Sequence, residues 1–364
     1  MDRSYCQVVI GVNIKKCKYF RRLTPERTLL LKKNSKEVQR KTEWRVYRRR
    51  KRRKLYETRR NIRRNERKYR QPRSRMKINH FKRREARLKL PAKFSFIQNP
   101  EEVLRFFGEL RKHAENNTDV VLDFADVQTL TPDVIPLLCA KVVVFAGRIN
   151  VHGNRPRKKE LDQMLLESGF YKLVGISRQK PRNALLEMHR EKIVMPLIAA
   201  DARRLTAEKT FGDPELHLQP LYRTLIECMA NTQKHADSQP SRISWWLSVY
   251  HDPLTRVTSF SFCDAGVGIF KSTKIKKLAK FAMTVGFWKN KDILKRILDG
   301  KIESSTGLHY RGKGLPKIYS DYKNKSIKRL FIVANDVFAD FDGGTFIELK
   351  NQLNGTFLYW EIFP

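Results

Sequence analysis

The feature that most constrains the fold of this chain is the uneven distribution of charge along its 364 residues. The formal net charge is +39, and the segment 32–89 alone holds about 28 Lys or Arg against about 5 acidic residues. This change in composition sets the first boundary, a basic segment over residues 1–90. With 41% hydrophobic residues overall, the chain can still build real cores beyond that segment.

The basic segment has the pattern of one long helix. No Gly or Pro lies between Lys36 and Gln71, and Pro72 would end the helix. Arg59, Arg63 and Arg67 repeat at i, i+4 and i+8, so their guanidinium groups would line one face. Because like charges at this spacing repel, we expect such a helix to form when phosphates neutralise it.

A charge of this sign and density indicates an anionic partner, and the interleaved tyrosines favour nucleic acid. Tyr47, Tyr56 and Tyr69 could add base stacking to phosphate contacts, without distinguishing DNA from RNA. The candidate contact residues are Arg49, Arg50, Arg52, Arg53, Arg59, Arg60, Arg63, Arg64, Arg67 and Arg70.

Residues 91–175 are predicted to form a small α/β domain. An amphipathic helix begins at Asn99-Pro100 and places Val103, Phe106, Phe107 and Leu110 at helical spacing. A buried strand (120–124), a helix (134–145), a strand (148–152) and a helix (161–170) follow. Strands that alternate with helices are typical of this class.

The run Val120–Asp133 resembles the core of STAS domains, the fold of bacterial anti-sigma-factor antagonists. The resemblance implies a protein partner at this domain. In antagonists that are switched by phosphorylation, a serine begins the helix after this loop. Here that position falls at Pro132 or Asp133, and Thr131 is the nearest hydroxyl, which argues against such a switch. An Asp at this point is also a suitable helix cap.

Residues 176–215 are predicted to be a connecting segment, and residues 216–364 carry the chemistry. In the helical pattern 221–236, Glu227 and Asn231 stand four residues apart on one face, and Lys234 follows one turn later. Taken alone, this pattern fits a solvated polar face equally well.

Two glycine-rich loops follow the helix and strengthen the case for a site. A strand pattern over 258–263 runs directly into Asp264, Gly266 and Gly268, where the backbone can approach a ligand closely. A second loop contains Gly312, Lys313 and Gly314. Three such elements in this order are stronger evidence than any single loop.

Together these elements resemble the N, G1 and G2 boxes of the GHKL ATPase superfamily (gyrase, heat-shock chaperone, histidine kinase, MutL). The resemblance implies an α/β sandwich with helices layered on a mixed sheet, and ATP and Mg²⁺ as ligands. It makes Asn231 the Mg²⁺ ligand and Glu227 the catalytic base, with Asp264 reading the adenine amine between Gly266 and Gly268. By the same resemblance Gly312, Lys313 and Gly314 close over the phosphates, and Lys234 reaches one of them.

The function expected from this resemblance is that of an Mg²⁺-ATP-binding regulatory protein. We expect slow hydrolysis and a nucleotide-controlled lid that acts on a protein or nucleic-acid partner. The alternatives are a serine/threonine protein kinase of the anti-sigma-factor type, and a nucleic-acid-binding protein that ATP modulates. The lysine-rich interval between Ile269 and Arg311 is a mobile cover, a partner-binding insertion or a solvated helix.

The sequence also favours a cytoplasmic protein without a membrane partner. The longest apolar runs, such as Val134–Ala146, fall short of the roughly 18–20 residues that a membrane-spanning helix needs. The start of the chain has no signal-peptide pattern. The five cysteines form no Cys-x-x-Cys pair, which indicates free thiols in a reducing compartment.

The basic segment predicts salt-dependent binding of nucleic acid. If it contacts about six phosphates, affinity for DNA or RNA should fall on the order of a thousandfold between roughly 50 and 200 mM salt. Replacing Arg59, Arg63 and Arg67 by Gln should make this dependence shallower, as measured by fluorescence anisotropy. Binding that ignores salt, or that is absent at low salt, would contradict the assignment.

Overall fold

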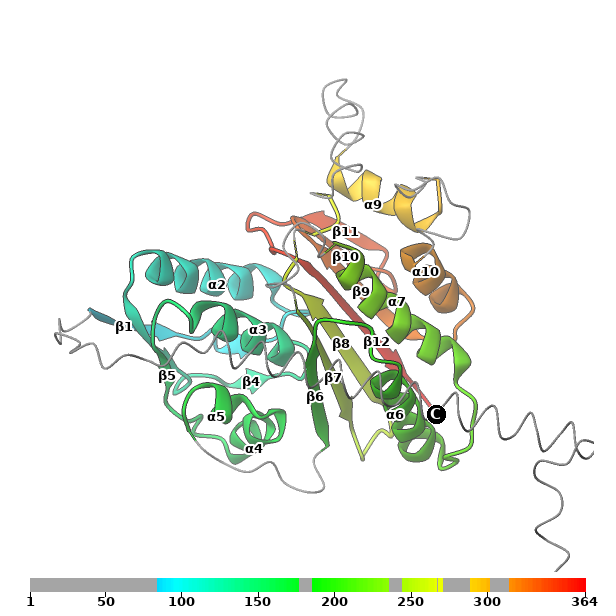
Figure 1. Cartoon of the computed structure of the whole chain (residues 1–364), viewed down its shortest axis with the longest axis horizontal. Helices are drawn as coiled ribbons and strands as arrows, with labels where there is room; N and C mark the ends of the chain where they lie inside the picture. The colour runs from blue at the N-terminus through cyan, green and yellow to red at the C-terminus, as the bar shows by residue number, and fades with distance from the viewer. Residues whose placement is uncertain (1–83, 177–184, 236–243, 267, 271–288, 302–313) are drawn as a thin grey trace, which may run out of the picture. The chain divides into compact units, whose positions relative to one another are not determined.

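The computed structural model describes residues 84–176, 185–235, 244–266, 268–270, 289–301 and 314–364 (Figure 1). All of them belong to one compact unit, Lys82–Pro364. The expected basic helix and its candidate arginines, from Arg49 to Arg70, lie outside the described residues.

The first part of the described chain is a parallel β-α-β region. Its three-stranded sheet has the order β1-β3-β5, and both neighbouring pairs are parallel. Two shorter strands, β2 and β4, alternate with these along the chain and form a separate parallel pair. The elements are β1 (Glu85–Lys89), β2 (Lys93–Phe94), α2 (Pro100–Glu115), β3 (Asp119–Asp123), β4 (Thr129–Leu130), α3 (Ile135–Phe145), β5 (Val151–Gly153), α4 (Lys159–Ser168) and α5 (Phe170–Leu173). The predicted small α/β arrangement is confirmed.

Helix α2 forms where the sequence pattern placed it. Pro100 occupies the first helical turn, where its missing N–H removes no helical hydrogen bond, and Glu101 and Glu102 complement the positive end of the helix. The four apolar residues predicted to share a face are all buried: Val103, Phe106, Phe107 and Leu110.

Asp133 does not cap α3, contrary to the helix-cap interpretation. Helix α3 begins after Val134 and has no side-chain cap. The Asp133 carboxylate instead accepts hydrogen bonds from the backbone N–H groups of Phe96 (2.6 Å) and Ile97 (3.0 Å) and lies 3.4 Å from the Ser95 hydroxyl. Asp133 is only 3% exposed, so its side chain ties the segment before α3 to the loop after β2 inside the fold.

The second part is a seven-stranded sheet with helices. Its strand order is β11-β10-β9-β12-β8-β7-β6. The strands are β6 (Leu186–Glu191), β7 (Trp245–His251), β8 (Thr258–Asp264), β9 (Lys328–Ala334), β10 (Val337–Asp340), β11 (Thr345–Glu348) and β12 (Thr356–Ile362). The helices are α6 (Pro196–Thr206), the π-helical turn η4 (Ala207–Phe211), α7 (Gln219–His235), α9 (Asn290–Leu298) and α10 (Gly314–Lys323).

The expected mixed sheet is wrong, because every neighbouring pair in this sheet is antiparallel. The segment 176–215, expected to be a connection, also contributes structure. Within it β6 pairs with β7 along six residues, and α6 packs against α7. The sequence of β6, Leu-Glu-Met-His-Arg-Glu, contains mostly polar and charged residues, as an edge strand can, and was therefore not recognised.

Both faces of this sheet are covered. Phe260 and Phe262 of β8 join a core with helices α6, α7, α9 and α10, whereas Cys263 joins the core of the β-α-β region. In Figure 1, α6, α7 and α10 follow one face of the sheet. Stacked rings, Phe260 on Trp360 at 5.3 Å, fill the helix-side core. Burial on both faces explains why β8 and β12 are almost continuously buried.

Two further expectations can be compared with the described residues. None of their helices is long and apolar enough to cross a membrane. Cys139, Cys228 and Cys263 are buried free thiols, and Cys6 and Cys17 lie outside the described residues.

The contact between the two parts of this unit should be important for stability. Phe96 and Phe357 are both fully buried and meet edge to face at 4.8 Å. Phe96→Ala should lower the free energy of unfolding by about 3–5 kcal/mol, because it leaves a cavity in a closed core. Val144→Ala, at a residue that is 51% exposed on α3, is the control and should change it by less than about 0.5 kcal/mol. Denaturant titration measures both, and a Phe96→Ala loss no larger than the control's would contradict the assigned contact.

Candidate functional site

The predicted polar pair lies against the beginning of another helix. Glu227 and Asn231 are half-buried on α7, and Gly314 is the first residue of α10. A Cβ atom built on Gly314 would lie 2.8 Å from Asn231 Nδ2 and 2.9 Å from Glu227 Oε2. The structure therefore brings together three of the predicted site residues from positions more than 80 apart in sequence.

The start of α10 gives this meeting point a positive character. The first four N–H groups of a helix have no partner within the helix, and the aligned peptide dipoles place partial positive charge there. The Glu227 carboxylate and the Asn231 amide stand beside this end. The local geometry can thus hold an anion at the N–H groups and a cation at the side-chain oxygens.

An ion pair with a buried carboxylate joins α10 to α7. Asp321 of α10 is 2% exposed and accepts hydrogen bonds from Arg223 (3.2 Å) and Thr224 (3.4 Å) of α7. Because the Asp321 carboxylate is buried, separating it from Arg223 would leave its charge poorly matched, which favours this arrangement of the two helices. The distance between Gly314 and the α7 side chains is therefore influenced by contacts about one to two turns away on each helix.

Asp264 lies at the end of β8 on the same side of the sheet as α7. Side chains alternate along a strand, and Asp264 shares the parity of Phe260 and Phe262, which face the helix-side core. Gly266 donates its backbone N–H to Asp264 Oδ1 at 2.8 Å, and Thr356, the register partner on β12, hydrogen-bonds the carboxylate as well. Burial outweighs these bonds and raises the pKa of Asp264 to about 6.

A buried thiol connects the two halves of the predicted site. Burial, followed by the nearby carboxylates of Glu227 and Asp264, raises the pKa of Cys228. Both carboxylates are therefore close enough to Cys228 to affect its ionisation. Asp264 of β8 and Glu227 of α7 therefore both lie in the neighbourhood of this buried α7 residue.

The glycine loop after Asp264 is closely packed. Gly268 has a left-handed φ of +79°, and a Cβ atom there would lie 2.4 Å from Asn335 Oδ1, so no other residue fits without rearrangement. Ile269 and Phe270 then enter the helix-side core.

Several predicted residues cannot be placed. Gly312 and Lys313 lie outside the described residues, as does the lysine-rich stretch 271–288. Lys234 belongs to α7, but its side chain is not among the described atoms.

The capacity of the described residues to bind a metal ion depends on their side-chain donors. The described residues contain no group of three or more His, Cys, Asp or Glu that could hold a metal ion. Asn231 and Glu227 nevertheless offer neighbouring hard oxygen atoms. Such a set fits Mg²⁺, which keeps several waters and takes one or two protein ligands with substrate phosphates.

The sequence interpretation missed three contributors. Gly355 directly precedes β12, the partner strand of β8, and Thr356 begins it. Gly355 has a φ of +119°, and a Cβ atom built on it would lie 2.0 Å from the Asp264 carbonyl oxygen. Lys141 of α3 is electrostatically coupled to Asp264 and Cys263, and burial lowers the pKa of Lys141 to about 8. A Gly-Thr pair at the beginning of a strand pattern could have indicated Gly355 and Thr356 from the sequence. Nothing in the sequence links Lys141 to this site.

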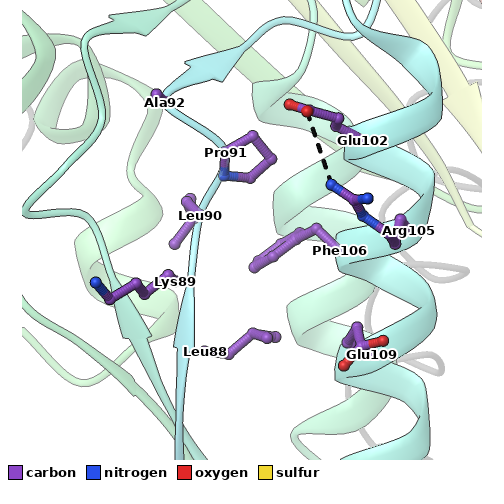
Figure 2. Close-up of a pocket in the computed structure, with 9 residues that line it drawn as sticks. All are labelled: Leu88, Lys89, Leu90, Pro91, Ala92, Glu102, Arg105, Phe106 and Glu109. Atoms are coloured by element: carbon purple, nitrogen blue, oxygen red, sulfur yellow. Dashed lines mark ion pairs between the residues drawn. The ribbon is translucent and has the colours of Figure 1, made fainter.

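A separate cavity of about 400 Å³ lies between β1 and α2 (Figure 2). Leu88, Leu90 and Phe106 form its apolar floor, and Glu102 pairs with Arg105 at 3.7 Å on its rim. None of the predicted site residues lines it. An open, mostly apolar hollow with a paired rim has no convergent polar groups to define a ligand.

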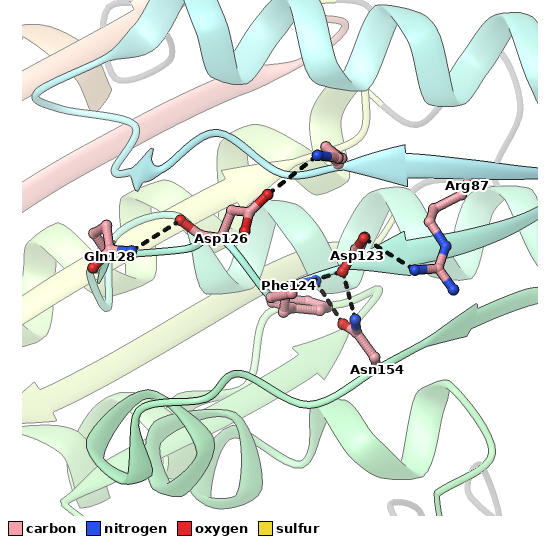
Figure 3. Close-up of polar contacts among 8 residues, drawn as sticks. Arg87, Asp123, Phe124, Asp126, Gln128 and Asn154 are labelled. Atoms are coloured by element: carbon pink, nitrogen blue, oxygen red, sulfur yellow. Dashed lines mark hydrogen bonds and ion pairs between the residues drawn. The ribbon is translucent and has the colours of Figure 1, made fainter.

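A polar cluster closes the end of the parallel sheet (Figure 3). Asp123 accepts hydrogen bonds from Ala125 N–H and Asn154, and lies 3.4 Å from an Arg87 nitrogen. The Ala125 N–H and then Asn154 hold the pKa of Asp123 below its usual value. Because its oxygens are occupied by these bonds, Asp123 orders the loop after β3.

Comparison with known proteins gives no assignment: no family model matches the sequence, and no curated protein matches it significantly.

The raised pKa of Asp264 predicts a pH-dependent gain in stability for Asp264→Asn. Since the folded pKa of about 6 exceeds the ordinary Asp pKa of 3.8, the stability contributed by protonation is full below pH 3.8 and is lost as the pH rises to about 6. At pH 7.5 the uncharged amide should therefore raise the melting temperature by roughly 2–6 °C, and the gain should disappear near pH 4. Asp126→Asn, at an exposed residue, is the control in calorimetric scans. An equal gain at both pH values would contradict the assignment.

Proposed function

We propose that this chain binds Mg²⁺-ATP between α7, the end of β8 and the start of α10, and that it hydrolyses ATP slowly. The observation that carries the proposal is the approach of Gly314 to Glu227 and Asn231. If Glu227 and Asn231 only formed a solvated surface, they would not be expected to contact the beginning of a second helix. The beginning of a helix favours phosphate, so the contact supports a phosphate site.

The roles of the residues follow from their positions. Asn231 would hold Mg²⁺ through its amide oxygen, and the backbone N–H groups at Gly314 would offset phosphate charge. Glu227, beside both, would orient and deprotonate the attacking water. Bound Mg²⁺ would contribute charge neutralisation at the phosphates.

Asp264 would recognise the base at the other end of the site. A carboxylate held by Gly266 and Thr356 keeps an acceptor available for an exocyclic amine. The Asp264 carboxyl group acts only as a hydrogen-bond acceptor when it is ionised. Since its pKa is raised to about 6, it should recognise an exocyclic amine more weakly below pH 6.

We propose in addition that the two regions have GHKL-type and STAS-like folds. Helices on one face of the seven-stranded sheet support a GHKL-type sandwich, and the parallel β-α-β region with its Asp123 loop supports a STAS-like region. The antiparallel pairing of all neighbouring strands departs from the mixed sheet that the resemblance implied.

The sheet argues against phosphoryl transfer from this site to the STAS-like region. Burial, then Glu361 and then Asp133 raise the pKa of Tyr359, so Asp133 lies near this tyrosine. The Tyr359 side chain belongs to the core on the β-α-β side, which places Asp133, at or next to the proposed switch position, on that side. Glu227 and Asn231 lie on α7, which packs on the opposite face. We therefore favour hydrolysis that controls a partner. A kinase acting on another protein, and a nucleic-acid-binding protein modulated by ATP, remain the alternatives.

The site predicts different effects for binding and for catalysis. Titration calorimetry should detect Mg²⁺-ATP with the wild type, and Asn231→Ala and Asp264→Asn should weaken binding at least about tenfold, because each removes a direct contact. Glu227→Ala should keep the affinity and lower turnover about 10²–10⁴-fold, as expected for a general base.

Glu115→Ala, an exposed residue at the end of α2, is the matched control and should leave both unchanged. No binding by folded wild type would refute the proposal, and unchanged turnover in Glu227→Ala would refute the assigned base. With ATP labelled at the γ-phosphate, label released as inorganic phosphate supports hydrolysis, and label retained on protein supports the kinase alternative.

A further inference from the structure

One turn outside the predicted motifs contacts the glycine loop directly. Asn335 and Asp336 form the two-residue connection between β9 and β10, where Ala334 pairs with Val337. Asn335 has a left-handed φ of +52° and is 2% exposed. Asn is among the few residues that adopt this conformation readily in such a hairpin.

The side chain of Asn335 holds the loop that follows Asp264. Its Oδ1 accepts the backbone N–H of Phe270 at 3.2 Å. Its amide also lies against Gly268, where a Cβ atom would come within 2.4 Å of Oδ1 and 2.5 Å of Nδ2. The loop backbone therefore rests on this amide with no room for a side chain between them.

The same turn anchors other segments around the site. The Asn335 carbonyl accepts the N–H of Leu353 at 2.7 Å, two residues before Gly355. The Asp336 carboxylate accepts hydrogen bonds from Asn290 at 2.7 and 2.9 Å, which fixes the beginning of α9. The glycine loop, α9 and the approach to β12 are thus all tied to two consecutive residues.

The position suits an amide better than the related side chains. A buried Asp would carry an ionisable group into a site that already contains Asp264, and burial of a charge is costly. A Gly would keep the left-handed backbone but lose the acceptor for Phe270. Asn supplies the acceptor and the backbone conformation without a charge.

We propose that Asn335 is a positioning residue for the nucleotide site, which fixes the glycine loop after Asp264 and thereby sets the affinity for ATP. This inference rests on the proposed function. Asn335 acts on the base-recognition side of the site, whereas Glu227 stands on α7. Loss of the Asn335 side chain should therefore weaken ATP binding and leave the chemical step nearly unchanged.

The first experiment needs no nucleotide. In hydrogen exchange of the ATP-free chain, Asn335→Gly should speed exchange of the Phe270 amide at least about tenfold, because its acceptor is gone. Asn117→Gly is the matched control, since Asn117 is an exposed Asn with a similar φ of +51°. It should leave Phe270 unchanged.

The second experiment measures steady-state ATP hydrolysis. Asn335→Gly should raise KM on the order of tenfold, which corresponds to the loss of about 1.4 kcal/mol of binding. Its kcat should stay within about twofold of wild type, and Asn117→Gly should change neither constant. If Asn335 only stabilised the fold, Asn335→Gly would lower the melting temperature. It would then leave KM unchanged at assay temperatures well below the melting temperature.

The outcomes separate this inference from the proposed function. If folded wild type binds no ATP, the proposed function fails and the effect on ATP affinity fails with it, whereas faster exchange at Phe270 in Asn335→Gly still shows that Asn335 holds the glycine loop. Unchanged exchange at Phe270, or an unchanged KM in an active enzyme, overturns the role of Asn335. If Asn335→Gly does not fold, Gly268→Ala disturbs the same contact from the loop side, and the same two readouts decide.

Discussion

The arrangement depends on a sheet that is buried on both faces. Strands β8 and β12 direct alternate side chains into two separate cores, so Phe260 and Phe262 face the helices while Cys263 faces the β-α-β region. A sheet covered in this way must fill both cores at native density, since voids on either side reduce stability. The strands that carry Asp264 and Thr356 are consequently held by packing on both faces and by a neighbouring strand on each side.

Polar groups collect where this rigid sheet ends. Asp264 is the last residue of β8, Thr356 is the first of β12, and Asn335 follows β9 directly. These three strands are neighbours, so their adjoining ends form a small polar surface on an apolar support. Burial makes such groups costly, as the raised pKa of Asp264 indicates. The proposed recognition of a base would account for an unfavourable carboxylate at this place.

The opposite face of the sheet gives the β-α-β region a role in this support. Phe96 packs on Phe357, one residue after Thr356, and Glu101 at the start of α2 accepts the backbone N–H of Lys350 at 2.7 Å. Lys141 adds a charge near Asp264 from the same side. The region thus contacts the strand and the loop that shape the site, while its own polar clusters at Asp123 and Asp133 serve internal order.

Local patterns predicted the elements more successfully than their pairing. The helix over 100–115 and the strand over 119–123 could be recognised because periodicity and Pro100 act within a few residues. The same is true of Glu227 and Asn231, whose spacing alone places them on one helix face. Edge strand β6 was missed because its exposed, charged side chains lack the apolar pattern of a strand. The Asn335-Asp336 hairpin carried a readable signal, a turn pair between two apolar runs, that was not used.

What the sequence determined by itself was therefore the local conformation and the chemical types of the site residues. Only the tertiary structure decided that Gly314 meets Glu227 and Asn231, that Thr356 pairs with Asp264, and that Asn335 supports Gly268. These contacts join residues that are distant in the chain, and strand order and packing on two cores set them. Antiparallel pairing likewise depends on which strands share a core, because each strand's own sequence is compatible with either direction.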